Sequence, residues 1–543
     1  MLETLKADML AGLTVAIVAL PLAMALAIAS GASPDKGLVT AVIAGFLISF
    51  LGGSRVQIGG PTGAFIVVVF SVIADHGYDG LVLATMLAGI ILIIAGYAKF
   101  GQVIKYIPYP VITGFTTGIA VIIATSQIKD FLGLKIGQVP ADFIPKWYFY
   151  FEHIETFDAL TLIIGLMTLA IILILKRFTP KWPSYLIAII LISGLVYMLQ
   201  IPVTTIGLRY PDIPSGLPLP ELPVWNTEKF LEIIPAAFTI AFLAGIEALL
   251  SATVADGMTG YKHRSNQELV AQGAANVASA LFGGLPATGA IARTATNIKS
   301  GGKTPMAGIF HAAFILIFIL FLTGVIAYIP LAALSAILFI VAWNMSEIKH
   351  FIHIFRLSKS DRLVMILTFS LTVLVDLTVA IGVGVTLASL LFMHQMSQSA
   401  TLYAQGRKIR DTSGEQRKEE DTQRDELPEG VEVFRITGPI FFGMADKMLE
   451  TMQAIGEMPK TLIVRMKLVP YMDVAGLNAL ENMIKTCQSK GSQVILSGLQ
   501  PQPKDMLNKD GVRDDQKNIF IVGNYEEAIA LSLKLSQDNQ SPE

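Results

Sequence analysis

The chain has 543 residues, of which 53% are hydrophobic and 15% are charged, and its mean hydropathy is +0.61. This composition has too few polar residues to cover a water-soluble surface, so it excludes a soluble globular protein and predicts a polytopic membrane protein. The formal net charge of −2 is close to balance and gives no basic surface for a nucleic-acid partner.

Several residue types that support catalysis or metal binding are absent or scattered. The single cysteine, Cys487, excludes a disulfide framework, and the seven histidines show no metal-ligand spacing. The GGKT stretch at 301–304 resembles the end of a phosphate-binding loop, but Asn297 stands where that loop needs its first glycine. We therefore expect no metal, no other cofactor and no enzymatic activity.

Apolar segments occupy most of the first 398 residues. A membrane-spanning helix takes roughly 20 apolar residues, and the first segment is too long for a signal peptide and lacks a cleavage site. We predict fourteen full or partial segments, two of them too short to cross, at 9–30, 36–52, 61–74, 80–98, 107–128, 158–175, 184–200, 230–255, 268–282, 288–298, 306–328, 330–345, 362–377 and 379–397.

Lysine and arginine residues gather on alternate connections between these segments. They stand near 55, 99–105, 176–181, 262–264, 299–303 and 349–362. By the positive-inside rule these connections and both termini are cytoplasmic. We therefore expect a multi-pass protein of the inner (plasma) membrane, with the longer connections 129–157 and 201–229 on the outside and without chemistry.

The composition changes after the last apolar segment. Residues 404–430 are charged at 14 of 27 positions and cannot form a core. From residue 431 onward, short β-type runs alternate with helical ones, which predicts a small soluble α/β domain. We expect a transmembrane domain at 1–398, a charged linker at 399–430 and a cytoplasmic domain at 431–543.

Two stretches of the membrane region match in kind. GGPTGAFIVVV begins at 59 and GGLPATGAIART at 283, and their prolines, Pro61 and Pro286, lie 225 positions apart. With seven segments in each half, the second copy enters the membrane in the opposite direction, which is the inverted repeat of many secondary transporters. Two short helices would then begin near the bilayer midplane and face each other.

Such helix starts favour an anion. Non-helical backbone at that depth requires protein cover or a water-filled cavity, and each helix start presents unpaired N–H groups and a partial positive charge. Arg293 adds a full charge, which needs a partner or a ligand inside a membrane. The alternatives are that Arg293 forms a structural ion pair or extends to the surface, and that the glycines only permit close helix packing.

Glu247 is the carboxylate placed deepest in a predicted span, and we expect it across the cavity from Arg293. It would either neutralise Arg293 as a structural ion pair or bind a proton together with the anion. The second option is proton symport. Ser251 follows one turn later, either as a supporting partner of Glu247 or as a serine bonded to its own helix.

Several stretches together resemble the SulP family of anion permeases, which is related to animal anion exchangers and prestin. The resemblance covers nearly the whole chain and includes a C-terminal domain similar to STAS. It implies a core-and-gate architecture of fourteen segments, and usually a homodimer. The stretches are LPLAMALAIASG (20–31), GGSRVQIGGPTGAF (52–65), YIPYPVITGFTTG (106–118), IEALLSATVADGMTG (246–260) and GGLPATGAIART (283–294).

The resemblance also implies which residues contact the substrate and the coupling ion. The expected coupling residues are Glu247 and Ser251. The expected substrate positions lie at the starts of segments three and ten, namely Thr62, Gly63, Ala64, Phe65, Gly289, Ala290, Ala292 and Arg293.

Departures from the family pattern bear on the coupling ion and the substrate. Sodium-coupled bicarbonate members resemble IDSLLT and GAT, where this chain has IEALLS and GAI, which disfavours sodium and favours a proton. Leu22 stands where many sulfate members carry a glutamine, and this departure weakens the prediction of sulfate as the substrate. The stretches TSQIKDFLGL (125–134), DGMTGYKH (256–263) and VAWNMSE (341–347) look most like the bacterial C4-dicarboxylic acid uptake branch.

We therefore expect a secondary active transporter that carries a C4-dicarboxylate or sulfate with a proton. Bicarbonate transport, a passive anion channel or an electromechanical protein on the same scaffold, and a nucleobase carrier are the alternatives. In the STAS-like domain, Val474 and Ala475 follow Asp473 where related regulatory domains have a phosphorylatable serine. This excludes that phosphoserine switch and leaves a folding, dimerisation or cytosolic partner module.

Overall fold

The computed structural model describes most of the chain, and the chain divides into two compact units, Met1–Ala388 and Ser389–Glu543. The described residues are 2–102, 107–137, 139–140, 142–179, 182–211, 214, 216–223, 227–375, 377–399, 401–405, 427, 430–441, 448, 458–512 and 518–538.

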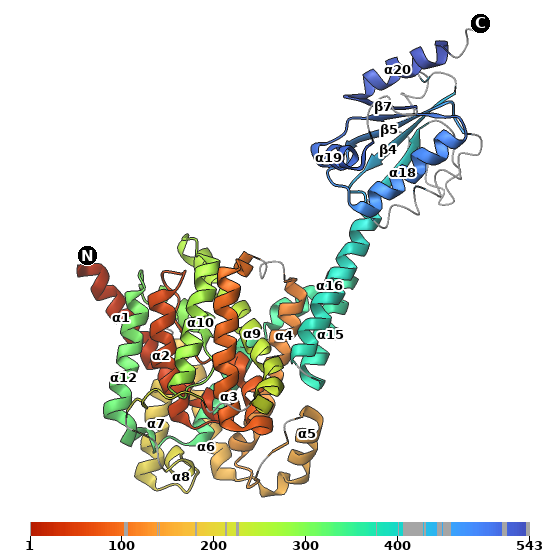
Figure 1. Cartoon of the computed structure of the whole chain (residues 1–543). Coiled ribbons are helices and arrows are strands. Elements are labelled where there is room, and N and C mark those ends of the chain that lie inside the picture. Colours follow the sequence, from red (N-terminus) through yellow and green to blue (C-terminus); the bar gives the residue numbers. More distant parts are fainter. Residues whose placement is uncertain are drawn as a thin grey trace. The chain divides into compact units, whose positions relative to one another are not determined.

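The first unit is built mainly of helices (Figure 1), and a two-stranded ribbon lies among them. The ribbon strands are β1 (Gly59–Gly60) and β2 (Thr288–Gly289), and the 3-10 turn η1 (Gly63–Phe65) leads from β1 into α3. The helices are α1 (Leu2–Ala29), α2 (Pro34–Leu51), α3 (Ile66–Tyr97), α4 (Tyr109–Leu132), α5 (Phe143–Glu152), α6 (Ala159–Phe178), α7 (Ser184–Leu199), α8 (Ile206–Arg209), α9 (Thr227–Thr259), α10 (Ser265–Leu281), α11 (Ile291–Lys299), α12 (Met306–Ile326), α13 (Leu331–Met345), α14 (Ile348–Arg356) and α15 (Lys359–Leu374), and α16 (Leu377–Ser399) runs on into the second unit.

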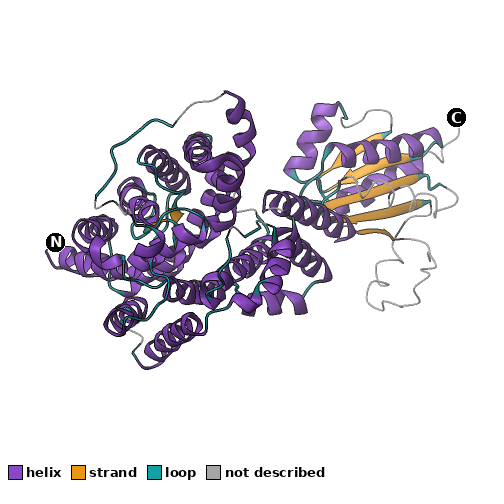
Figure 2. Cartoon of the chain, turned by 90° about the horizontal axis from the view of Figure 1, so that it is seen from below, coloured by secondary structure: helices purple, strands orange, loops and turns teal. Residues whose placement is uncertain are grey.

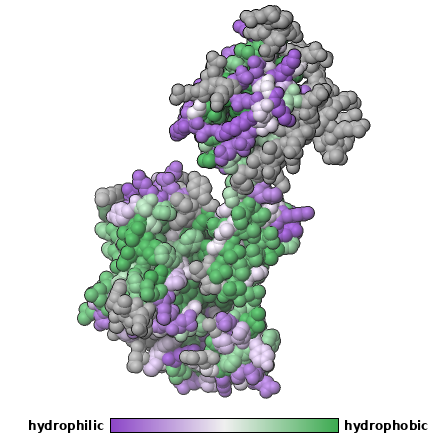
Figure 3. Space-filling model, turned by 45° about the vertical axis from the view of Figure 1, so that its right-hand side comes forward, coloured by the Kyte–Doolittle hydropathy of each residue, from purple (hydrophilic) through white to green (hydrophobic). Residues whose placement is uncertain are grey.

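Among the described residues, eight helices are long and apolar enough to cross a membrane, and two shorter apolar helices accompany them. Figure 3 shows a band of hydrophobic side chains on this unit, with hydrophilic ones toward both ends. Helix α3 bends at Gly77, whose φ of 75° lies in the left-handed region. The bend falls between the predicted segments 61–74 and 80–98, while the total of fourteen segments stays a prediction.

The helices of the first unit form two bundles. In one, here called the core bundle, α3 packs on α9 and α10, and α1 and α2 pack on α12. In the other, the gate bundle, α4 packs on α13 and α15, and α6 packs on α7 and α13. The core bundle pairs helices from the first half of the chain with helices from the second half, as an inverted repeat requires.

Small residues allow the closest of these helix contacts. Gly89 of α3 faces Gly273 of α10, and a Cβ atom added to either would lie within 2.6 Å of the other's carbonyl oxygen. Glycine pairs of this kind let two helix backbones approach in a membrane, where van der Waals contact rather than burial from water favours association. This contact fixes α3, and with it the ribbon strand that precedes it.

The second unit has a five-stranded sheet in the order β3-β4-β5-β6-β7, with helices packed on it (Figure 2). Strands β4 to β7 are parallel, and β3 pairs antiparallel with β4. The elements are β3 (Thr401–Gln405), β4 (Val431–Thr437), β5 (Thr461–Leu468), α18 (Val474–Ser489), β6 (Gln493–Ser497), α19 (Pro501–Asp510), β7 (Ile519–Val522) and α20 (Tyr525–Asp538).

Two sequence expectations about this unit can be compared with the structure. Residues 401–405, which lie within the linker expected at 399–430, form β3, because an edge strand needs a partner backbone rather than an apolar sequence. Asp473 caps α18 by accepting a hydrogen bond from the Gly476 N–H at 2.7 Å. Most of residues 445–458, one of the helical runs expected after residue 431, and most of the linker lie outside the described residues.

Candidate functional site

The two matching stretches of sequence meet in the ribbon. Strands β1 and β2 are antiparallel, and Gly59 pairs with Gly289 and Gly60 with Thr288. The chain continues from β1 through η1 into α3, and from β2 into α11. The two helices therefore begin side by side and leave in opposite directions, with the unpaired N–H groups of both starts at the ribbon. This is the arrangement that the repeat predicts.

Arg293 lies in the first turn of α11 and is only 2% exposed. Its two terminal nitrogens donate to the Gly59 carbonyl at 3.2 Å and the Pro61 carbonyl at 3.1 Å. Its Nε has no partner among the described residues. The guanidinium group thus crosses from one arm of the repeat to the other and carries its charge to the start of α3.

Gly60 has to be glycine for this contact. Its φ is +147°, and a Cβ atom at this position would lie 2.0 Å from the Nη1 atom of Arg293. Gly289 is equally constrained, because a Cβ atom there would lie 1.4 Å from the Nε2 atom of Gln57. The glycines that break the helical pattern therefore provide space for polar side chains between the two arms.

Two further side chains of α11 hold the first arm. The Thr294 hydroxyl accepts a hydrogen bond from the Ile58 N–H at 3.2 Å, and Asn297 donates to the Val56 carbonyl at 2.8 Å. Both residues are buried, whereas Ala292, on another face of the helix, is exposed. One face of α11 therefore forms hydrogen bonds with the backbone of the first arm, and another face is exposed.

Glu247 lies on α9, which packs on the ribbon and on α11. Its carboxylate accepts a hydrogen bond from the Thr62 hydroxyl at 2.8 Å, and the side chain is partly exposed. Glu247 and Arg293 interact electrostatically, but within the described chain they form no direct ion pair. The structure therefore brings Glu247 to the substrate position expected at Thr62, and not into contact with Arg293.

The other predicted residues also gather at the ribbon. Ser251 is fully buried and donates to the Thr294 hydroxyl at 3.3 Å, so it contacts α11 rather than Glu247. Gly63 touches Met345 and Ile123 of the gate bundle, where a Cβ atom would come within 2.8 Å and 3.2 Å of their side chains. The site thus lies on the border between the two bundles. The remaining predicted residues, all buried, are Thr62, Ala64, Phe65, Gly289 and Ala290.

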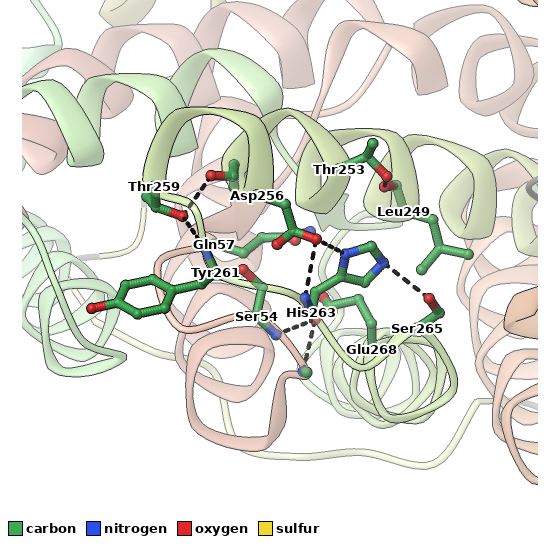
Figure 4. A network of polar contacts seen from close by, with 12 residues as sticks. Ser54, Gln57, Leu249, Thr253, Asp256, Thr259, Tyr261, His263, Ser265 and Glu268 are labelled. Atoms are coloured by element: carbon green, nitrogen blue, oxygen red, sulfur yellow. Dashed lines mark hydrogen bonds and ion pairs between the residues drawn. The ribbon is translucent and has the colours of Figure 1, made fainter.

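The sequence reading missed two buried carboxylates that support this arrangement. Glu268 of α10 accepts hydrogen bonds from the N–H groups of Gly53 at 2.8 Å and Ser54 at 3.1 Å, in the loop that leads to β1 (Figure 4). Asp8 of α1 accepts from the N–H groups of Lys303 at 2.7 Å and Thr304 at 3.2 Å, in the loop after α11. A carboxylate at the edge of an apolar segment is the signal that was available in the sequence.

Figure 4 also shows His263 between Asp256 and Ser265, where α9 turns into α10. The His263 Nδ1 atom lies 2.7 Å from Asp256, and its Nε2 atom lies 3.0 Å from the Ser265 hydroxyl. The order of these groups resembles a hydrolytic triad, but Ser265 begins α10 and is only 9% exposed. The three residues therefore fasten the α9–α10 turn.

A cavity of about 270 Å³ lies elsewhere, between α4, α5 and α13. It is almost wholly apolar and holds none of the predicted site residues. Its lining residues are Ile128, Phe131, Leu132, Trp147, Tyr150, Phe151, Ile154 and Phe339.

Comparison with known proteins identifies both units. The profile of the sulfate permease family matches residues 5–368, and that of the STAS domain matches residues 424–524. The chain is 41% identical to a Bacillus subtilis protein named "Putative sulfate transporter YvdB", over 94% of each chain. It is 34% identical to "Bicarbonate transporter BicA" of Picosynechococcus sp., over 93% of this chain and 91% of that one. The solved structure of SLC26A9 shares the fold, with a TM-score of 0.83 at 20% identity over 98% of this chain and 91% of that one.

Proposed function

The chain belongs to the sulfate permease family, a family of anion transporters, and we propose that it carries a small oxyanion together with a proton by moving its core bundle against its gate bundle. C4-dicarboxylates and sulfate are the proposed substrates. The Arg293 guanidinium group, bonded across the ribbon to the carbonyls of Gly59 and Pro61, is the observation that supports an anion most directly.

The charge at the ribbon depends on the protonation of Glu247. Two helix starts contribute roughly half a positive charge each, and Arg293 contributes one more. An ionised Glu247 offsets the arginine, whereas a protonated Glu247 leaves it uncompensated. A proton on Glu247 therefore favours an anion at the ribbon, and by linkage the anion favours the proton. This mutual preference is the physical basis of the proposed symport.

The Thr62 hydroxyl connects the two binding events. It donates to Glu247 in the structure and also stands at the start of the turn that leads into α3. When Glu247 is protonated, it no longer needs this donor, and the Thr62 hydroxyl becomes free to donate to an anion. The same hydroxyl would then serve the carboxylate in one state and the substrate in the other.

The substrate class follows from the donors at the site. Backbone N–H groups, one hydroxyl and one guanidinium group suit a compact oxyanion and do not discriminate strongly among such ions. The relatives named for sulfate and for bicarbonate transport fit this class. Bicarbonate is the second candidate, because BicA is 34% identical to the chain. The residues that depart from the sodium-coupled pattern favour a proton over sodium.

Uptake into proteoliposomes tests the proposal. Labelled sulfate, succinate and bicarbonate are offered separately, with an imposed proton gradient, an imposed sodium gradient or no gradient. We expect an inward proton gradient to drive accumulation of sulfate or succinate, and a protonophore to abolish it. Accumulation driven by sodium, or uptake that ignores both gradients as in a passive channel, would overturn the proposed coupling.

The proposed setting of the protein is a homodimer in the inner membrane, with both termini and the STAS domain in the cytoplasm. The alternate placement of basic connections supports this orientation. Protease accessibility of the STAS domain in inside-out and right-side-out vesicles tests the orientation. Cleavage only in right-side-out vesicles would contradict it.

A further inference from the structure

The site opens toward one end of the transmembrane unit. On α11, Ala292 and Lys299 are seven residues apart, so they share one face, and both are exposed. On α3, the residues just after the ribbon are buried, with Ile66 at 2% and Val69 at 1% exposure. The ribbon is therefore more exposed on the side of α11 than at the first turn of α3, and we take these as the open and the closed route of an anion.

A lysine of α5, a helix that packs on the gate bundle, lies beside the closed route. Helix α5 packs on α4 and α15, and its Lys146 places the ammonium nitrogen 5.4 Å from the centre of the Phe70 ring on α3. Phe70 stands four residues after Ile66, which is about 6 Å further along the helix axis. Lys146 is thus a cation about one helical turn beyond the start of α3, where the gate bundle meets the core bundle.

The surroundings of Lys146 leave its charge largely uncompensated. The residue is 5% exposed, and across the described residues its ammonium group forms no ion pair or hydrogen bond. The aromatic face of Phe70 attracts the ammonium group, but such a contact replaces only part of a lost hydration shell. Burial lowers the pKa of Lys146, and the carboxylate of Asp142 acts in the opposite direction. The nitrogen is not among the fully buried atoms that lack a partner, so it keeps some contact with solvent, and a mostly buried cation of this kind is stabilised when an anion approaches.

We propose that Lys146 is a second anion-contacting residue, which receives the transported anion on the α3 side of the ribbon. The proposal rests on the proposed function. In the present conformation the ammonium group lies on Phe70 and closes this route. When the core bundle moves and the route opens, Lys146 leaves the ring and binds the anion that enters or leaves there.

A purely structural role predicts a different dependence on charge. The four-carbon stem of Lys146 could simply fill space beside Phe70, and an apolar side chain of similar length would then serve equally well. An anion-binding role requires the positive charge itself. The chain also offers a matched control, because Lys135 follows α4 in the same connection and is exposed.

The test measures exchange of labelled sulfate between the two sides of proteoliposomes, without a gradient, for Lys146→Met, Lys146→Cys and Lys135→Met. We expect KM for sulfate to rise about tenfold in both Lys146 variants, because the anion loses the attraction of one nearby positive charge. In Lys135→Met we expect KM to stay unchanged. Treating Lys146→Cys with 2-aminoethyl methanethiosulfonate adds an ammonium group and should restore KM. The 2-sulfonatoethyl reagent, which adds a negative charge, should raise it further.

The native cysteine does not interfere with this chemistry. Cys487 is buried in α18, and burial raises the pKa of its thiol to about 11, so little thiolate is present at neutral pH. A wild-type KM in Lys146→Met, or equal rescue by both reagents, would overturn the role of Lys146 and leave the proposed function intact. Absence of sulfate, succinate and bicarbonate exchange in the wild-type protein would overturn both.

Discussion

The two arms of the repeat are alike in sequence at the ribbon and different immediately after it. The first arm continues into Phe65 and an apolar run, whereas the second continues into Arg293, Thr294 and Asn297. All three polar side chains of the second arm bond to the backbone of the first, between Val56 and Pro61. The first arm therefore supplies backbone and a helix start, and the second arm supplies charge and the groups that hold the first in place.

This difference shows how a membrane protein tolerates irregular backbone at its centre. Carbonyl and N–H groups that leave a helix there need partners, since lipid provides none. In this chain the partners are side chains of the opposite arm, together with Glu268 of α10 and Asp8 of α1, which accept from N–H groups of the flanking loops. Arg293 both satisfies backbone carbonyls and carries a positive charge to the ribbon.

Removing the charge of the second arm should have the largest effect. We expect Arg293→Ala to weaken sulfate binding about 100-fold or more, because truncating a buried hydrogen-bonded charge costs about 2–5 kcal/mol. Isothermal titration of the detergent-solubilised protein measures the binding. The thermal unfolding temperature serves as the control for folding, and a folded variant with unchanged affinity would remove Arg293 from the site.

Replacing Arg293 with lysine separates the effect of its charge from the effect of its hydrogen bonds to the first arm. Arg293→Lys keeps the charge but cannot donate to the Gly59 and Pro61 carbonyls with the fork geometry of a guanidinium group. We expect its affinity to fall between those of the wild-type protein and Arg293→Ala. Equal losses in both variants would mean that bridging of the arms, rather than charge, determines binding.

The first arm can be disturbed through its glycine. Gly60→Ala places a Cβ atom against the Arg293 guanidinium group and strains a φ of +147°, so we expect transport to be lost and the protein to be destabilised. Gly77→Ala is the matched control, since Gly77 has a φ of 75° but open space around it. Backbone strain alone costs about 1–3 kcal/mol. Similar activity and melting temperatures in the two variants would show that close approach to Arg293 is unimportant.

Glu247 lies between the arms and should control the dependence on pH. In the wild-type protein we expect uptake to fall as the pH rises, because the anion prefers a protonated carboxylate at the ribbon. Glu247→Gln resembles the protonated form, so sulfate exchange should persist and become independent of pH, while accumulation driven by a proton gradient should disappear. Exchange and accumulation measured from pH 5 to pH 8 distinguish these outcomes, and an unchanged pH profile would contradict the role of Glu247.

The sequence predicts the positions of the two helix starts and the place of Arg293 beside them, because glycine pairs, prolines and a charged residue in an apolar segment are local signals. It does not predict which atoms Arg293 contacts, since that depends on the register between strands about 230 residues apart. The sequence places Glu247 opposite Arg293, whereas in the structure Glu247 bonds to Thr62. This partner also depends on how segments far apart in the chain pack, which the sequence does not give. Strand β3 was not expected at residues 401–405, next to the charged stretch, because its pairing with β4 is a tertiary contact.

Thr294 tests whether the second arm holds the first by neutral groups as well as by charge. Its hydroxyl accepts the Ile58 N–H at 3.2 Å, and Thr294→Val leaves that buried donor without a partner. Such a loss costs about 1–3 kcal/mol. We expect a lower melting temperature and a modest rise in KM for sulfate, with no change in the pH profile. A shifted pH profile would instead connect Thr294 to proton binding.

Ser251→Ala should have the smallest effect. Its hydroxyl donates to Thr294 at 3.3 Å, which is long for an O–H donor, and the acceptor keeps its bond from Ile58 when Ser251 is removed. The loss should therefore stay within about 0.5–1.5 kcal/mol of stability and leave coupling unchanged. Ser251 lies one turn after Glu247 on α9. If it took part in proton transfer, Ser251→Ala would impair coupling and leave stability unchanged. Proton-driven accumulation that fails in Ser251→Ala, at wild-type stability, would place the serine beside Glu247 in function and would require α9 to rotate away from α11 during transport.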